Sequence, residues 1–176
     1  MNLVKMLTEK ILFKESAYVT KYEGDKNIID KHVEHILLFD KGRVSSNQGG
    51  YQSHDITFGF QELIQFAQTC LTKLEYSFTF GNFWLNVNKG NHYNDEHIHG
   101  LAGMSAVYYH KTCCDKTPIY FKHLVPAIVE TTVEFSPNDG DIIFFPSHIT
   151  HGVKACGNVD HERISIAMNF PGKFKE

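Results

Sequence analysis

Apolar and polar residues alternate along much of the second half of the chain. The segment 83–88 has apolar residues at its odd positions, and the segment 163–170 has them at its even positions. Successive side chains of a β-strand point to opposite faces, so this period of two predicts two strands that each have one apolar face. The same pattern, or a short apolar run, predicts further strands at 105–110, 119–123, 128–135 and 141–145.

The first half of the chain carries helical periodicity instead. Apolar residues recur every three or four positions over 27–39 and over 60–74, which predicts two amphipathic helices. Residues 11–22 are expected to be extended, and 42–53 form a loop by composition. Many short strands joined by turns predict a sandwich or barrel. We therefore expect a mainly β protein with flanking helices.

Length and charge narrow the picture further. A chain of 176 residues suits one domain, with 1–75 as a helix-bearing support and 76–171 as a β core. The net charge of −3 and the pI near 6.4 give no electrostatic reason to expect a nucleic-acid partner. No apolar run is long enough to cross a bilayer, and residues 1–16 lack a secretory pattern. A cytoplasmic protein with reduced cysteines and no membrane partner is the expectation.

The candidate chemistry lies in a split set of histidines. In His97-Ile98-His99, two imidazoles at i and i+2 are expected on one face of a strand. His151 follows 52 residues after His99, behind an apolar strand and a Pro146-Ser147 turn. Three imidazoles would hold a metal ion and leave coordination positions open, which indicates catalysis rather than structural support. Arg163, on the last strand, could bind a carboxylate.

Several motifs in this half occur together. They are Trp84-x-Asn86, His97-x-His99, the strand 105–109, the run from Gly140-Asp141 to His151, and Arg163-Ile164-Ser165. With them, the stretch 83–170 resembles the catalytic core of the Fe(II)/2-oxoglutarate-dependent oxygenases, which are double-stranded β-helix (jelly-roll, cupin-like) proteins. It is most similar to a bacterial and phage subgroup with an H-x-H motif.

The resemblance implies a role for individual residues. His97 and His151 correspond to iron ligands, and Arg163 with Ser165 to the residues that hold the far carboxylate of 2-oxoglutarate. His99 departs from the family, which usually has a carboxylate there; Asp95 shares the face of His97 and is the alternative third ligand. Further cosubstrate contacts are expected from two residues, Asn86 and Tyr93.

The resemblance also implies an activity. We expect an Fe(II)- and 2-oxoglutarate-dependent dioxygenase that hydroxylates a C–H bond of an unknown substrate and releases succinate and carbon dioxide. Two alternatives stay open. One is a cupin-like three-histidine metalloenzyme that does not use 2-oxoglutarate, although the Glu expected shortly after H-x-H is missing. The other is a non-catalytic jelly-roll binding module whose histidines are vestigial or hold zinc.

Overall fold

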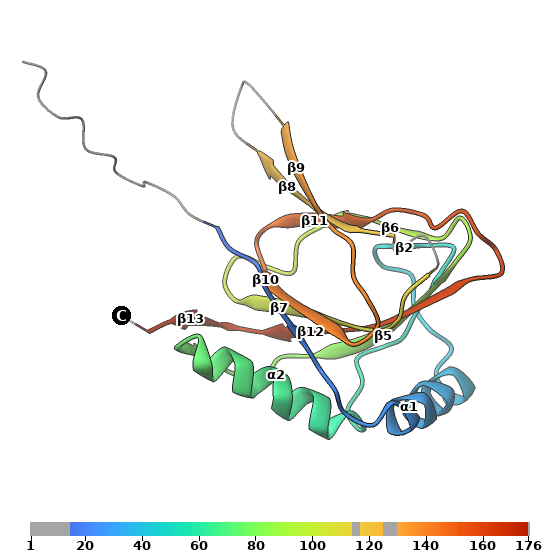
Figure 1. Ribbon diagram of the computed structural model, residues 1–176, viewed down its shortest axis with the longest axis horizontal. Coiled ribbons are helices and arrows are strands. Elements are labelled where there is room, and N and C mark those ends of the chain that lie inside the picture. The colour runs from blue at the N-terminus through green and yellow to red at the C-terminus, as the bar shows by residue number, and fades with distance from the viewer. Residues whose placement is uncertain (1–14, 114–116, 125–129, 176) are drawn as a thin grey trace, which may run out of the picture.

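The computed structural model describes residues 15–113, 117–124 and 130–175 (Figure 1). The two helices are α1 (Lys26–Phe39) and α2 (Gln61–Lys73). The strands are β1 (Tyr18–Lys21), β2 (Asn47–Gln48), β3 (Tyr51–Gln52), β4 (Tyr76–Phe78), β5 (Phe83–Lys89), β6 (Tyr93–His97), β7 (Met104–Lys111), β8 (Ile119–Leu124), β9 (Glu130–Phe135), β10 (Asp141–Pro146), β11 (Thr150–Val153), β12 (Glu162–Phe170) and β13 (Gly172–Phe174).

Two antiparallel sheets make up the body of the protein. One has six strands in the order β1-β10-β7-β12-β5-β3, and the other has five in the order β2-β6-β11-β8-β9. A short pair, β4 and β13, stands beside them. Neighbouring strands come from distant parts of the chain, which is the connectivity of a jelly roll rather than of a meander.

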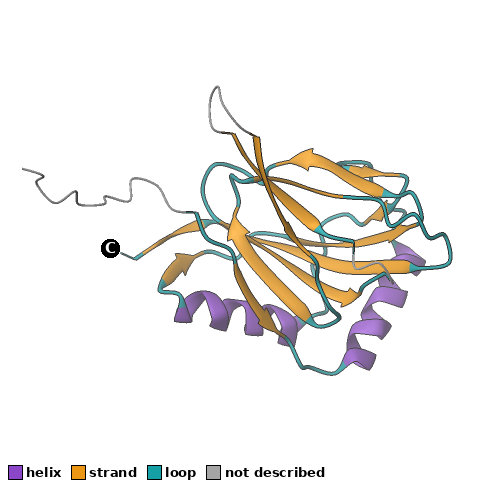
Figure 2. Cartoon of the chain, turned by 45° about the horizontal axis from the view of Figure 1, so that its top comes forward, coloured by secondary structure: helices purple, strands orange, loops and turns teal. Residues whose placement is uncertain are grey.

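The outer face of the six-stranded sheet is covered by both helices (Figures 1 and 2). Helix α1 begins where the Asp25 side chain accepts a hydrogen bond from the Asn27 backbone N–H at 2.9 Å. Each helix turns three apolar side chains inward, and these pack on the even-numbered residues of β12 to form the larger core. Its central residues include Leu63, Leu71, Ile166 and Met168.

A second, smaller apolar cluster fills the space between the two sheets. It combines Trp84, Val107 and Phe145 of the six-stranded sheet with Ile119 of the five-stranded sheet. Strand β12 contributes Ala167 to this cluster and Ile166 to the outer core. Alternate residues of one strand therefore serve two different environments, as the alternation in the sequence predicts.

Most predicted elements are confirmed by the structure. Both helices lie within one residue of their predicted ends, and the strands predicted in the second half are all present. Part of two predicted segments, residues 11–14 and 128–129, lies outside the described residues. The predicted loop 42–53 contains the short strands β2 and β3, which pair with β6 and β5. The first 75 residues thus contribute strands to both sheets, in addition to the two supporting helices. No helix in the described ranges is long and apolar enough to cross a membrane.

Candidate metal centre

The three histidines meet at one end of the five-stranded sheet. His97 is the last residue of β6 and lies directly opposite His151 of the neighbouring strand β11. His99 lies beyond the end of β6, where its backbone N–H donates to the Ser147 carbonyl at 2.8 Å. The predicted i, i+2 pair therefore does face one site, although only His97 belongs to the strand.

The imidazole nitrogens are close enough to share one ion. Nε2 of His99 and Nε2 of His151 are 3.1 Å apart, and the candidate ligand atoms of all three histidines lie within 4.8 Å of one another. The ring centroids are separated by 4.4 to 4.8 Å, so the three rings surround a common point. Three protein ligands on one side leave the remaining coordination positions of an ion open.

Backbone carbonyls set the tautomers of two of these rings. Nδ1 of His97 donates to the Asp95 carbonyl at 2.7 Å, and Nδ1 of His151 donates to the Ile149 carbonyl at 2.9 Å. A carbonyl can only accept, so Nδ1 carries the proton and the Nε2 lone pair is left for a metal ion. Such orienting hydrogen bonds are the usual outer support of a metal-binding histidine.

Burial keeps all three imidazoles neutral. Burial lowers the pKa of His97, and burial together with the neighbouring imidazoles lowers the pKa of His99 to about 3 and the pKa of His151 to about 4. A histidine must be neutral to bind a metal ion, so protons do not compete with the metal near neutral pH.

These pKa values predict how the metal-free protein responds to acid. A lowered pKa in the folded state means that the unfolded chain binds more protons, so the contribution to stability is full above pH 6.5 and is lost as the pH falls toward 4. We expect the melting temperature of the metal-free protein to fall between about pH 7 and about pH 5. The fall should be smaller for His99→Gln, and equal falls in both proteins would contradict the assignment.

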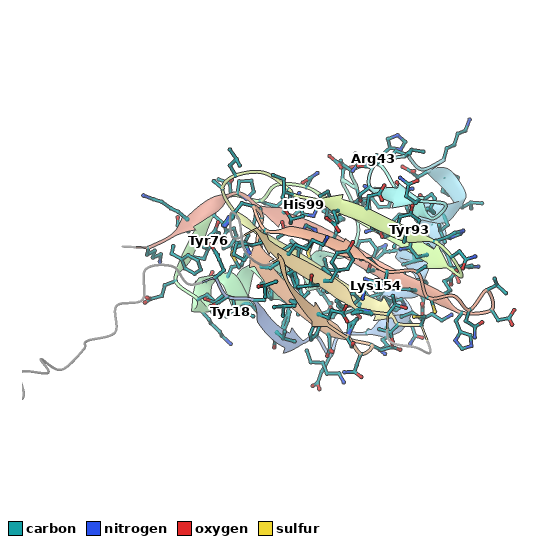
Figure 3. All side chains as sticks on the ribbon, turned by 90° about the horizontal axis from the view of Figure 1, so that it is seen from above. Tyr18, Arg43, Tyr76, Tyr93, His99 and Lys154 are labelled. Carbon is teal, nitrogen blue, oxygen red and sulfur yellow. The ribbon has the colours of Figure 1, made fainter. Side chains whose placement is uncertain are left out.

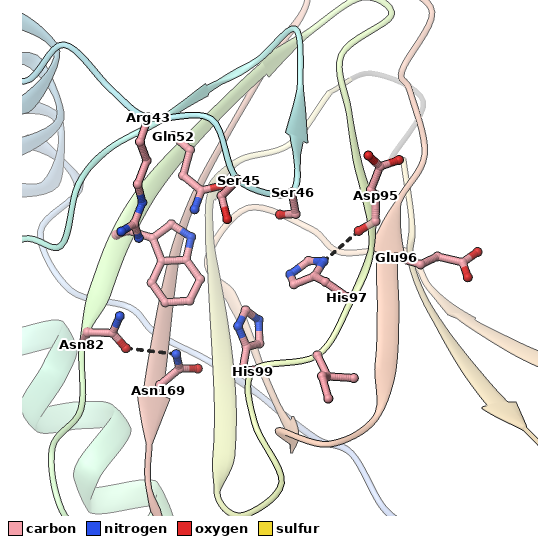
Figure 4. A pocket seen from close by; sticks show the side chains of 12 residues that line it. Arg43, Ser45, Ser46, Gln52, Asn82, Asp95, Glu96, His97, His99 and Asn169 are labelled. Atoms are coloured by element: carbon pink, nitrogen blue, oxygen red, sulfur yellow. Dashed lines mark hydrogen bonds between the residues drawn. The ribbon is translucent and has the colours of Figure 1, made fainter.

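Asp95, the alternative third ligand, does not join the group. Its carboxylate Oδ2 accepts a hydrogen bond from Gln48 Nε2 at 2.5 Å. Figure 4 shows the Asp95 carboxylate turned away from His97 and His99. Among the described residues, the candidate metal-holding cluster of three or more ligands consists of the three histidines.

A buried cation, Arg163, lines the same cavity as the three histidines. Arg163 is 5% exposed, and its Nε and Nη1 atoms are buried without a hydrogen-bond partner among the described residues. Its guanidinium carbon lies 5.1 Å from the centre of the Tyr109 ring. Burial raises the pKa of the Tyr109 hydroxyl to about 12, although the positive charge of Arg163 opposes the shift. Buried N–H groups of a cation that lack an acceptor are unfavourable, so this position is suited to an anion.

Strand pairing brings the remaining polar residues to this cation. Ser165 and Asn86 are register partners on β12 and β5, and Asn86 Oδ1 is also buried without a partner. One cavity between the sheets contains the polar side chains of Asn86, His97, His99, His151, Arg163 and Ser165. The structure thus unites six of the seven predicted site residues.

Tyr93 is the predicted residue that the structure places elsewhere. It is 42% exposed on β6, pairs with Gln48 of the edge strand, and does not line the cavity (Figure 3). Tyr109 was missed by the sequence reasoning, although it pairs with Ser165 and contacts Arg163. Alternation along the strand could have identified it, because Tyr109 lies two residues after Val107 and therefore faces the inner cluster as Val107 does.

Comparison with known proteins identifies the class. Residues 82–169 match the sequence family described as "Putative 2OG-Fe(II) oxygenase", and the chain belongs to this family. Its cofactors are Fe(II) and 2-oxoglutarate, and the protein is accordingly a 2-oxoglutarate-dependent oxygenase. No curated protein sequence matches the chain.

Solved structures share the fold at low sequence identity. A prolyl-4-hydroxylase from Pseudomonas putida is 15% identical with a TM-score of 0.62, over 89% of this chain and 92% of that one. The viral collagen prolyl hydroxylase of Paramecium Bursaria Chlorella virus-1, in its 2OG complex, is 14% identical with a TM-score of 0.59, over 88% and 94%. The alpha-ketoglutarate-dependent epimerase SnoN from nogalamycin biosynthesis is 11% identical with a TM-score of 0.69, over 89% and 76%. The predicted double-stranded β-helix is confirmed.

Proposed function

We propose that His97, His99 and His151 hold Fe(II), and that Arg163 with Ser165 binds the far carboxylate of 2-oxoglutarate. The observation that carries this proposal is that one cavity contains both a set of metal-binding groups and a cation with nitrogens that lack hydrogen-bond acceptors. Three neutral imidazoles face a common point, and a buried guanidinium with two unpartnered nitrogens lines the same cavity. A ligand that coordinates a metal at one end and carries a carboxylate at the other satisfies both.

The donor set suits a dianionic cosubstrate. A third imidazole in place of a carboxylate leaves the metal site one unit more positive than the common two-histidine, one-carboxylate set. Together with Arg163, this charge favours a ligand with two carboxylates. Asn86 lines the same cavity, and its side-chain amide N–H groups can donate to a carboxylate of that ligand.

The chain's residues contribute geometry and the exclusion of water. When bound, Fe(II) with 2-oxoglutarate and dioxygen would supply oxidative decarboxylation to succinate and carbon dioxide together with the oxidation of a C–H bond, one oxygen atom going to each product. The imidazoles fix the position of the metal, and Arg163 fixes the far end of the cosubstrate. Val107, Ile119 and Ala167 line the cavity with apolar surface and keep water out of it.

Hydroxylation of a C–H bond is the reaction that we propose for this site. Prolyl hydroxylases appear among the similar structures, but so does an epimerase, so the fold alone selects no single outcome. Cys70 and Cys156 form no disulfide among the described residues, which supports the proposal of a reducing, cytoplasmic environment in which iron is kept as Fe(II).

The test is an anaerobic titration of the Fe(II)-loaded protein with 2-oxoglutarate, followed by visible absorption. Chelation of Fe(II) by the cosubstrate is expected to give a weak, saturable charge-transfer band. Iron binding without this band would overturn the cosubstrate assignment and favour a three-histidine enzyme that needs no oxo-acid. Failure to bind iron would overturn the metal assignment and leave a binding module.

A further inference from the structure

A second cavity opens beside the histidines. It has a volume of about 430 Å³ and shares Trp84, His97 and His99 with the cavity that contains Arg163. Figure 4 shows Arg43, Gln52 and Asn82 on one side, Asp95 and Glu96 on the other, and His99 between them. A molecule in this cavity would lie next to the proposed metal ion, so its walls bear on the choice of substrate.

One wall is held in place by a continuous chain of hydrogen bonds. Arg43 Nη2 donates to Asp55 Oδ1 at 2.8 Å, and Asn82 Nδ2 donates to Asp55 Oδ2 at 3.1 Å. Asn169 Nδ2 donates to Asn82 Oδ1 at 3.0 Å, and Ser105 Oγ donates to Asn169 Oδ1 at 2.9 Å. A wall fixed in this way is preorganised, so little side-chain ordering is needed when a ligand binds.

Two polar atoms of this wall have no partner. Gln52 is 4% exposed, and its Oε1 is buried without a donor among the described residues. Nε of Arg43 is likewise buried without an acceptor there. The two residues are neighbours, because the Arg43 backbone N–H donates to the Gln52 carbonyl at 2.7 Å. Both residues line the cavity, so one unsatisfied acceptor and one unsatisfied donor belong to side chains of the same wall.

We infer that this cavity binds the substrate, and that it recognises a flat group with a donor and an acceptor on one edge: a primary carboxamide or a lactam. The inference rests on the proposed function, since it assigns the substrate of that same site. The amide N–H would donate to Gln52 Oε1, and the amide carbonyl would accept from Arg43 Nε. The indole of Trp84 offers a planar surface for such a group.

Charge argues against a phosphate or another strong anion in this cavity. The guanidinium of Arg43 already forms an ion pair with Asp55. Asp95 and Glu96 line the same cavity, and a carboxylate-bearing wall repels an anion. A neutral ligand that hydrogen-bonds is therefore favoured over a charged one.

Trp84 provides a direct readout of this cavity. It is the one tryptophan of the chain, and its ring centroid lies 5.2 Å from that of His99. Tryptophan fluorescence therefore reports a ligand in this cavity without any need for turnover.

The experiment titrates the anaerobic protein, loaded with Fe(II) and 2-oxoglutarate, with 2-pyrrolidinone and with N-methyl-2-pyrrolidinone. The lactam is expected to change the fluorescence in a saturable way. The N-methyl compound lacks the donor that Gln52 requires, so it should bind about tenfold or more weakly. In Gln52→Leu, this preference should vanish, whereas the matched control Gln65→Leu, on an exposed part of α2, should keep it. Gln52→Glu retains an acceptor oxygen, and it should retain the preference in case Gln52→Leu does not fold.

Equal binding of the two compounds to the wild type, or no saturable change with either, would overturn the inference. The charge-transfer band with 2-oxoglutarate, measured on the same samples, separates this failure from failure of the proposed function. If the band forms and the lactam does not bind, the substrate assignment alone is wrong. If the band is missing, the same fluorescence titration on the metal-free protein still shows whether the cavity distinguishes the lactam from its N-methyl derivative.

Discussion

The His99→Ala variant is expected to bind Fe(II) at least about 100-fold more weakly than the wild type. Mutating the outer support of a metal ligand commonly costs about 10- to 100-fold in affinity, and removal of a ligand itself should cost no less. His99 supplies one of three imidazoles around the site, and its Nε2 lies 3.1 Å from that of His151. The measurement is anaerobic Fe(II) titration by calorimetry.

Asp95→Ala is the decisive control for this prediction. Its backbone carbonyl, which orients His97, remains after the substitution, while the carboxylate that binds Gln48 is lost. Iron affinity should therefore stay close to that of the wild type. His161→Ala, at an exposed position, controls for loss of a histidine as such. If Asp95→Ala lost iron and His99→Ala kept it, the ligand set would be two histidines and a carboxylate.

Replacing Arg163 by Ala should weaken 2-oxoglutarate binding by at least about 30-fold and leave the Fe(II) affinity unchanged. Truncating one partner of a buried, hydrogen-bonded charge pair costs about 2–5 kcal/mol, which sets this lower limit. The prediction follows from the burial of Arg163 at 5% exposure and from its two unpartnered nitrogens. The dissociation constant comes from the same charge-transfer titration, run on the iron-loaded variant.

Two substitutions at this position separate charge from geometry. Arg163→Lys keeps the positive charge but loses the planar fork, and it should bind 2-oxoglutarate with intermediate affinity. Arg163→Met removes a buried cation with two unpartnered nitrogens, so the melting temperature of the metal-free protein should rise. Unchanged cosubstrate affinity in all three variants would show that the far carboxylate binds elsewhere.

The alternation of residues in β5 and β12 was enough to predict which side chains face the site. Arg163 and Ser165 share a face with Ala167, and the pairing of β12 with β5 places Asn86 opposite Ser165. A strand has only two faces, so once the apolar residues are assigned to the outer core, the remaining residues must face the cavity. The same logic correctly placed Ile164 and Ile166 in the outer core.

Prediction was weaker where long-range pairing decides the structure. Tyr93 lies in a segment whose residues are mostly exposed, and its partner β2 is a strand of two residues within a loop. Nothing local in the sequence reveals that pairing, which is set by register between distant segments. The wall built from Arg43, Gln52 and Asn82 could not be predicted either. Its hydrogen bonds connect residues that are not neighbours in the chain, so no local pattern indicates them.

Strand β12 contributes both to the core and to the site, and this double role limits which insertions and deletions the strand can tolerate. Its even-numbered residues anchor the helices, and its odd-numbered residues carry Arg163 and Ser165 into the interior. A deletion or insertion of one codon within 163–167 would exchange the two faces, burying a guanidinium under α2 and turning isoleucines into the cavity. Such an event would remove the anion site and the core together. Length variation among homologues should therefore be found in the connecting turns and be absent from this strand.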